Sequence, residues 1–205
     1  MPNKMTVVRT NSTPNSIREV QLKALTFQEL WDNYPSGDPY NNPAYRDQCA
    51  IRMSVTFHRV GVAMKSFSEK LVKPKSGAPT IGRIILDGKA TATRADELGE
   101  WLQLQPFAGL PRAENITGRV WESKVKGRTG IVLFSRYWTR DGESVADASG
   151  GHIDLWNGRR LTVSGPFDAV ATASRMFGGN SFRPGSTIGW SDLGNSKSIL
   201  FWEIK

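Results

Sequence analysis

Apolar residues in the first half of the chain recur at helical spacing. The first helix is predicted to begin at Thr26, whose hydroxyl and the Glu29 carboxylate fit a capping box, and to end before Pro35. Its apolar stripe consists of Phe27, Leu30, Trp31 and Tyr34. A second helix is predicted over about residues 47–60, with Ala50, Met53, Phe57 and Val60 on one face. A third is predicted to begin at Thr93, with Asp96 as its capping partner.

The second half of the chain changes to strand patterns. Residues 130–138 form a β-branched and aromatic run, and a last strand is predicted over residues 198–204. Residues 153–156 and 160–163 flank the dipeptide Asn157-Gly158, which predicts a β-hairpin. A short strand is expected at residues 84–86. Helices that precede antiparallel strands predict an α+β fold, with N-terminal helices packed on an antiparallel sheet.

The length of 205 residues fits a single catalytic domain over residues 1–205. Residues 1–20 are rich in Asn, Thr, Ser and Pro, which predicts a loose leader, and the glycine-rich residues 165–189 read as an insertion or surface loop. The N-terminus has no apolar stretch long enough for a secretory signal. The sequence contains no run of about 18 apolar residues, so no membrane span is predicted.

The chain is basic, with 27 Lys and Arg against 19 Asp and Glu, a net charge of +8 and a pI near 9.8. This charge favours a nucleic acid, a membrane surface or a carboxylate-rich wall polymer, and does not choose among them. No phosphate-binding glycine loop, zinc spacing or RNA-binding aromatic signature is present, so a nucleic-acid partner is not expected. One cysteine and two histidines exclude an internal disulfide and a Cys- or His-rich metal site, and no cofactor is expected.

Cys49, the single cysteine, lies at the start of the second predicted helix. The partial positive charge of a helix N-terminus favours the reactive thiolate, and Arg46 and Arg52 would add to this effect if they lie near. The alternative is a buried, inert cysteine that acts as a small hydrophobic residue.

A cysteine hydrolase needs an imidazole to accept the thiol proton and return it to the leaving amine. His58 lies on the same predicted helix, on the opposite face and about 13 Å along the axis, so it cannot be the partner of Cys49. His152 remains, after a glycine pair at the start of a strand. Strand alternation places His152, Asp154 and Trp156 on one face, which suits the wall of a cleft, although an ordinary half-exposed strand histidine is the alternative.

A helix-borne cysteine followed by a strand-borne histidine is the order of papain-like cysteine hydrolases. A third polar group usually orients the imidazole. Asp154 is the nearest candidate on the same strand face, and Asp168 and Asp147 are alternatives.

Five segments of the chain resemble the fourth family of type VI secretion amidase effectors. They are LWDNYP (30–35), QCAIRMS (48–54), GHIDLWNG (151–158), GWSDL (189–193) and ILFW (199–202). The resemblance implies a papain-like, NlpC-type fold and hydrolysis of the amide between D-glutamate and meso-diaminopimelate in peptidoglycan stem peptides. It also implies synthesis in the bacterial cytoplasm without a signal peptide, delivery by the type VI secretion machinery into the periplasm of a target cell, and a cognate immunity protein that blocks the active site.

The resemblance further implies catalysis by a cysteine, a histidine and an aspartate. Cys49 and His152 match its motifs, but the position of the aspartate corresponds here to Val163, so that role passes to Asp154, to Asp168 or to another group. We expect Cys49 to attack, its backbone N–H to stabilise the oxyanion, and Trp156 and residues 36–45 to line the substrate groove. The alternatives are a cysteine acyltransferase or transglutaminase with the same site, or a basic cell-wall-binding protein without chemistry.

Overall fold

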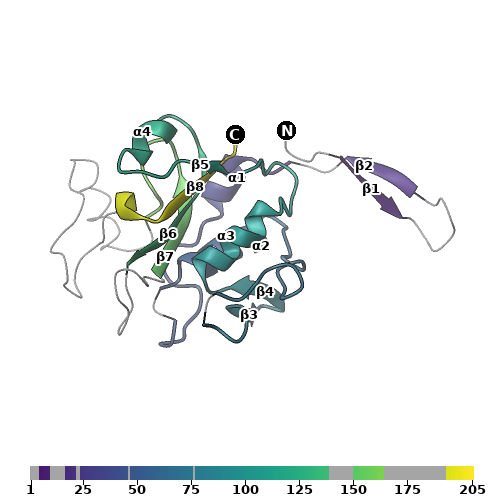
Figure 1. The fold of residues 1–205 in the computed structure, drawn as a ribbon. Coiled ribbons are helices and arrows are strands. Elements are labelled where there is room, and N and C mark those ends of the chain that lie inside the picture. The colour runs from purple at the N-terminus through teal and green to yellow at the C-terminus, as the bar shows by residue number, and fades with distance from the viewer. Residues whose placement is uncertain are drawn as a thin grey trace.

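The computed structural model describes residues 5–9, 17–21, 24–45, 47–75, 77–138, 150–163 and 193–205. The helices are α1 (Phe27–Asp32), α2 (Cys49–Arg59), α3 (Ala95–Gln103) and α4 (Trp121–Val125), with a 3-10 turn η2 (Leu193–Asn195). The strands are β1 (Met5–Arg9), β2 (Ile17–Gln21), β3 (Arg83–Leu86), β4 (Lys89–Ala92), β5 (Glu114–Asn115), β6 (Gly130–Trp138), β7 (Gly150–Trp156) and β8 (Ser198–Glu203). The arrangement is the predicted α+β class, with every strand pair antiparallel (Figure 1).

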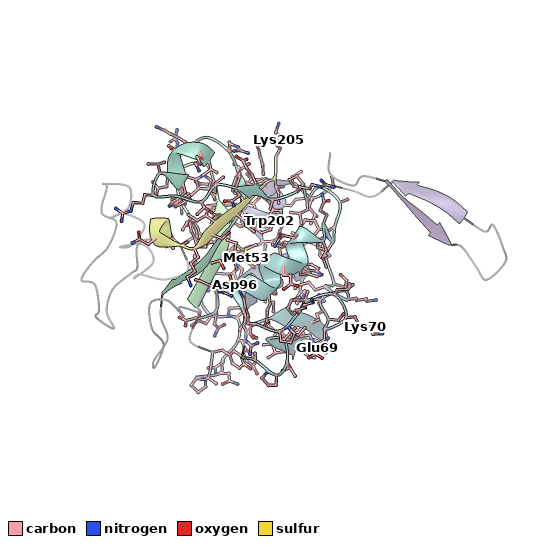
Figure 2. The ribbon with its side chains drawn as sticks, in the orientation of Figure 1. Met53, Glu69, Lys70, Asp96, Trp202 and Lys205 are labelled. Carbon is pink, nitrogen blue, oxygen red and sulfur yellow. The ribbon has the colours of Figure 1, made fainter. Side chains whose placement is uncertain are left out.

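The main sheet has four strands in the order β5-β8-β6-β7, so β7 lies at an edge. Helices α2 and α3 pack against β7 and lie next to each other beside the sheet (Figure 1). The core between these helices and the sheet includes Met53 of α2, Leu98 of α3 and Trp202 of β8, all fully buried (Figure 2). The sheet therefore fixes β7 directly against the N-terminal half of the molecule.

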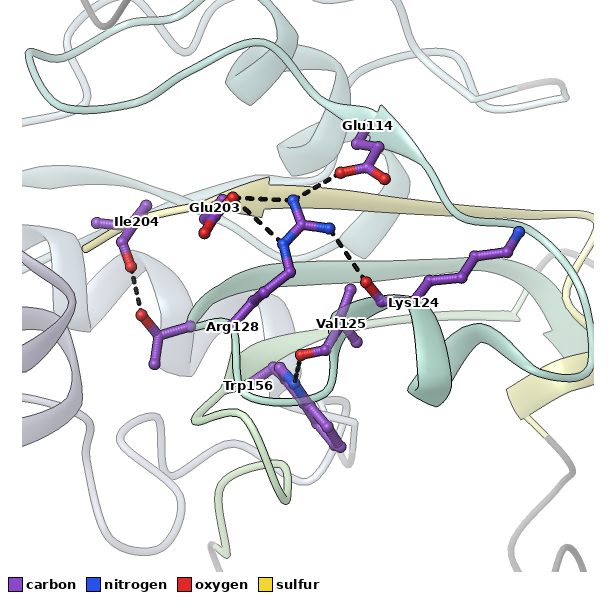
Figure 3. A network of polar contacts seen from close by, with 8 residues as sticks. Glu114, Lys124, Val125, Arg128, Trp156, Glu203 and Ile204 are labelled. Atoms are coloured by element: carbon purple, nitrogen blue, oxygen red, sulfur yellow. Dashed lines mark hydrogen bonds and ion pairs between the residues drawn. The ribbon is translucent and has the colours of Figure 1, made fainter.

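A second buried cluster covers the opposite face of the sheet and includes Trp121 of α4, Phe134 of β6 and Trp156 of β7. Polar contacts hold this layer from the side (Figure 3). The Arg128 guanidinium lies 2.7 Å from the Glu114 carboxylate and 2.9 Å from that of Glu203, which joins β5 and β8 to the segment after α4. Both faces of the sheet are thus covered.

Strand β6 has the predicted bounds, and its pairing with β7 is regular from Gly130↔Trp156 to Phe134↔His152. The next pair is Trp138↔Gly150, so four steps along β6 match two steps along β7. Such a bulge re-aims side chains at a sheet edge. It lies immediately beside His152.

The capping box predicted at the start of α1 is present. The Glu29 N–H donates to the Thr26 hydroxyl at 3.3 Å, and the Thr26 N–H donates to the Glu29 carboxylate at 3.0 Å, which completes the capping box. The corresponding prediction for α3 is wrong, because α3 begins at Ala95 without a side-chain cap. The proposed capping residue Asp96 instead pairs with Lys75 at 2.5 Å.

The hairpin predicted around Asn157-Gly158 is also wrong. Only one bridge, Trp156↔Leu161, joins the two sides of this turn, and residues 160–163 form no strand. The Asn157 side-chain oxygen accepts the N–H groups of Arg159 and Arg160 at 3.1 and 2.9 Å, which closes the turn locally. Residues 160–163 therefore return beside β7 without adding a strand to the sheet.

The hairpin of β3 and β4 was only half predicted. β3 was expected, but its partner β4 was not, and the two are joined by Asp87 and Gly88, both at positive φ (50° and 73°). Asp-Gly between two strands is the sequence typical of a two-residue hairpin turn.

Residues 1–20, predicted to be a loose leader, contain two paired strands, with β1 and β2 in register from Met5↔Gln21 to Arg9↔Ile17. Their β-branched residues favour strands. The glycine-rich residues 165–189 lie outside the described residues. Among the described helices, none has the length and apolar character needed to cross a membrane.

Candidate active site

Cys49 is the first residue of α2, as the sequence predicts, and belongs to the core cluster beneath the sheet. The residue is 9% exposed. Its Sγ lies 4.0 Å from the carbonyl oxygen of Gly151, which directly precedes His152 on β7. The packing of α2 on the edge strand therefore brings together two residues that are about a hundred positions apart in the sequence.

His152 lies on the edge strand, opposite Phe134 and beside the bulge in β6. Its ring stacks on that of Phe134, with centroids 6.3 Å apart and planes 24° apart. The His152 Nε2 lies 3.3 Å from the Asp154 Oδ2. With Nε2 engaged in this way, Nδ1 is the ring nitrogen left for the thiol.

The surroundings of His152 favour its charged form. Burial lowers the pKa of His152, but hydrogen bonds with Asp154 and with the Cys49 thiol outweigh this effect and raise the pKa from 6.5 to about 10. An imidazolium beside a thiol suits proton transfer to a leaving amine, and the same ring can accept a proton from water in a second step.

Asp154 is buried, with 4% exposure, and its two carboxylate oxygens have different partners. Oδ2 faces His152, whereas Oδ1 accepts the Leu155 N–H at 2.8 Å and the Thr162 hydroxyl. Such contacts meet the need of a buried carboxylate for hydrogen-bond donors. The alternatives Asp147 and Asp168 lie outside the described residues.

Two other predicted positions have structural roles. Trp156 is 4% exposed in the second core cluster, and its indole N–H donates to the Val125 carbonyl at 3.0 Å (Figure 3). This burial argues against the expected substrate contact, because the strand face that was predicted to form a cleft wall is covered at Trp156. His58 lies 3.0 Å from the Ala90 carbonyl oxygen, and burial lowers its pKa, which agrees with the exclusion of His58 from the site.

Gln48, which sequence reasoning missed, holds the loop before α2. Its side chain is almost fully buried, and Nε2 donates to the carbonyl oxygens of Tyr40 and Tyr45 at 2.6 and 3.0 Å. Its Oε1 accepts the Tyr40 N–H at 3.0 Å. The sequence offered one signal for this role, a polar side chain directly before the cysteine. The hydrogen-bond partners of that side chain depend on the fold, so the sequence did not reveal them.

Arg52 was expected to influence the thiol, and the structure gives it contacts with the same loop. Its guanidinium donates to the Gly37 carbonyl at 3.0 Å and to the Asp38 carboxylate at 2.7 Å. Arg46, the other expected cation, lies outside the described residues. Gln48 and Arg52 therefore hold residues 37–45 close to the start of α2.

The described residues include no group of three or more His, Cys, Asp or Glu side chains that could hold a metal ion. What the site contains is a thiol beside the backbone that carries His152, the His152 imidazole, and a buried carboxylate 3.3 Å from that ring. This order can support nucleophilic attack by sulfur on a carbonyl carbon.

Comparison with known proteins identifies the family of the chain. The family model described as "Type VI secretion system (T6SS), amidase effector protein 4" matches residues 45–202. No curated protein matches the chain.

Among solved structures, the chain is similar to the type VI effector Tae4 from Enterobacter cloacae, with 14% identity, a TM-score of 0.51, and coverage of 91% of this chain and 100% of that one. It is also similar to the Tae4-Tai4 effector-immunity complex from Enterobacter cloacae, with 17% identity, a TM-score of 0.47, and coverage of 89% and 100%. The Tae4-Tai4 complex from Salmonella Typhimurium matches at 18% identity and a TM-score of 0.44, over 68% of this chain and 86% of that one. At such identities, the first of these similarities supports the fold alone.

Proposed function

Because the chain belongs to the family of type VI secretion system amidase effector protein 4, we propose that it hydrolyses the amide between D-glutamate and meso-diaminopimelate in peptidoglycan stem peptides. Members of this family are antibacterial amidase effectors that act on peptidoglycan. The observation that carries the proposal is the position of the Cys49 thiol at the start of α2, 4.0 Å from the carbonyl oxygen of Gly151 directly before His152, whose Nε2 lies 3.3 Å from the buried Asp154 carboxylate.

In the first step, the Cys49 sulfur attacks the carbonyl carbon of the glutamyl amide. His152 transfers its proton to the amide nitrogen, the C–N bond breaks, and the diaminopimelate amine leaves with a thioester on Cys49. In the second step, the neutral His152 removes a proton from water, the hydroxide attacks the thioester, and the sulfur leaves as thiolate. The raised pKa of His152 supports its role as the acid of the first step.

The oxyanion of each step needs hydrogen-bond donors. Cys49 is the first residue of α2, and the first N–H groups of a helix have no acceptor within the helix. We assign the Cys49 N–H to the oxyanion hole, where a preorganised donor is worth about 3 kcal/mol in comparable enzymes. The Gln48 amide does not serve here, because its nitrogen already donates to two carbonyl groups.

Asp154 is assigned as the third member of the site. Its Oδ2 lies 3.3 Å from the His152 Nε2, which leaves Nδ1 for the thiol and favours the reactive tautomer. The loop of residues 37–45, held by Gln48 and Arg52, is assigned to one side of the substrate groove. The helix-borne thiol and the strand-borne imidazole support our proposal that the fold is of the papain-like, NlpC type.

The family also implies partners. The solved complexes of similar effectors contain the immunity protein Tai4. We therefore propose that a cognate immunity protein covers the Cys49 site in the producing cell. As an effector of the type VI secretion machinery, the protein reaches target cells, and we place its action in their periplasm, where peptidoglycan is accessible.

The test is mass analysis of fragments released from purified sacculi by the wild type, Cys49→Ala and His152→Ala. Hydrolysis predicts a new free amine on diaminopimelate and a new glutamyl carboxylate, with no product from either variant. A new amide or ester in place of the carboxylate would indicate an acyltransferase. Binding to sacculi without any new product would indicate a non-enzymatic wall-binding protein, and either result would overturn the proposal.

A further inference from the structure

The carboxylate beside His152 is held from a segment that follows the sheet. Asp154 is almost fully buried, and its Oδ1 accepts one hydrogen bond from the Leu155 N–H and one from the Thr162 hydroxyl. The Leu155 donor belongs to the same strand and is a neighbour in the sequence. Thr162 is the one side chain among these partners that comes from outside β7.

Thr162 reaches Asp154 because of the turn after β7. The bridge Trp156↔Leu161 brings the chain back beside the strand, and Thr162 follows directly, with 7% exposure. The next residue, Val163, is 39% exposed and carries no carboxylate. The segment after the turn therefore contributes the Thr162 hydroxyl as a hydrogen-bond donor, whereas the carboxylate itself, Asp154, belongs to β7.

The hydrogen bonds at Thr162 have a defined direction. An ionised carboxylate only accepts, so the single proton of the Thr162 hydroxyl points to Asp154. The Tyr34 hydroxyl is influenced by both groups: burial and the nearby charge of Asp154 raise its pKa, whereas Thr162 lowers it. Because the net shift is upward, the phenol keeps its proton beside Thr162.

We propose that Thr162, backed by Tyr34, is a positioning residue that fixes the rotamer of Asp154 and thereby keeps its Oδ2 directed at His152. The inference rests on the proposed catalytic function of Cys49, His152 and Asp154. Two donors on Oδ1 oppose rotation of the carboxylate, since rotation would break both bonds inside a buried site. Without Thr162, the Leu155 N–H is the one donor that Oδ1 retains among the described residues.

The test compares Thr162→Val, which removes the hydroxyl at nearly constant volume, with Thr162→Ser, which retains it. We measure kcat and KM on soluble peptidoglycan fragments from pH 6 to about 10.5, and the melting temperature of each variant. The loss of one hydrogen bond to a charged group predicts a fall in kcat of about 10- to 100-fold for Thr162→Val, with little change in KM. The alkaline limb of the pH profile should also move to lower pH, because a misdirected Asp154 no longer sustains the raised pKa of His152.

Thr162→Ser should recover both kcat and the wild-type alkaline limb. Thr56→Val is the matched control: the Thr56 hydroxyl is also buried, but donates to the Arg52 carbonyl at 2.9 Å within α2, so this variant should change stability and leave the alkaline limb in place.

A Thr162→Val enzyme with an unchanged alkaline limb and a kcat within about twofold of the wild type would overturn the positioning role. So would a loss that Thr162→Ser does not recover. If Thr162→Val fails to fold, Tyr34→Phe decides: it should move the limb in the same direction by a smaller amount, and an unmoved limb contradicts the proposal. Failure of the hydrolase proposal can be distinguished from failure of the positioning role, because the wild type itself would then release no fragments.

Discussion

Replacement of Asp154 by asparagine tests the proposed acid at almost constant shape. Oδ1 of the new side chain can keep the Leu155 N–H and the Thr162 hydroxyl as donors. This fixes the orientation of the amide, since a flip would place its NH2 group against both donors. The amide nitrogen then faces the His152 Nε2 in place of Oδ2.

The consequence is a change of tautomer. An amide nitrogen donates, so Nε2 must accept and the ring proton moves to Nδ1, the nitrogen left for the thiol. A neutral ring with a protonated Nδ1 cannot accept the thiol proton. The equivalent change in a serine protease costs about 10⁴ in kcat, and we expect a loss of about 10³- to 10⁴-fold here. This equals about 4 to 5.5 kcal/mol of transition-state stabilisation.

The assay is the rate of fragment release from soluble peptidoglycan fragments, measured with the melting temperature. Because both contacts of Oδ1 persist, the free energy of unfolding should fall by no more than about 1–2 kcal/mol. Asp32→Asn is the control: Asp32 lies at the end of α1, where its carboxylate accepts the Gln28 side-chain amide at 2.7 Å, and the variant should keep wild-type activity. An Asp154→Asn enzyme within tenfold of the wild type would refute the tautomer argument and return the role of the acid to a residue outside the described ranges.

Four further outcomes are expected. The folded-state pKa of His152 (about 10) exceeds its unfolded value near 6.5. The contribution of His152 to stability is therefore complete below pH 6.5 and is lost as the pH rises through about 10. Urea midpoints and kcat should both decline at that alkaline end. Gly151→Ala places a Cβ 3.1 Å from the Asp96 carboxylate and 3.2 Å from the Phe134 carbonyl oxygen, and the resulting shift of the strand should lower kcat about tenfold, as fragment release would measure. Glu97→Ala removes the acceptor of two backbone N–H groups and one guanidinium, which should cost about 3 kcal/mol in urea unfolding. His58→Gln should leave the rate of fragment release unchanged, and a large loss would contradict its exclusion from the site.

Local sequence signals predicted much of the fold. The capping box at Thr26 needs only residues three apart, and the strand at residues 130–138 follows from a β-branched and aromatic run whose residues 131–134 are buried on both faces. The start of α2 at Cys49 and the side of β7 that carries His152 also follow from local periodicity. These features depend on chain neighbours, so the sequence contains them directly.

Features that depend on distant partners were not predictable in this way. At the start of α3, Lys75 draws Asp96 into an ion pair and removes the expected local cap. Asn157-Gly158 forms its turn, but the following segment is drawn to Asp154 through Thr162 and does not pair as a strand. Periodicity likewise placed Trp156 beside His152, but could not reveal that a second layer of side chains covers it.

The membership of Cys49 in the core cluster has a practical consequence. Its neighbours there include Leu30, Met53 and Leu98, which join three helices. The proposed nucleophile is therefore part of the same packed core as these helices, and we expect it to be ordered and lost together with that core. We expect reactivity of the thiol toward a small alkylating reagent and catalytic turnover to report the same quantity, the fraction of molecules that are folded. For variants far from the site, the potency of the effector should then follow that fraction, with each folded molecule fully active.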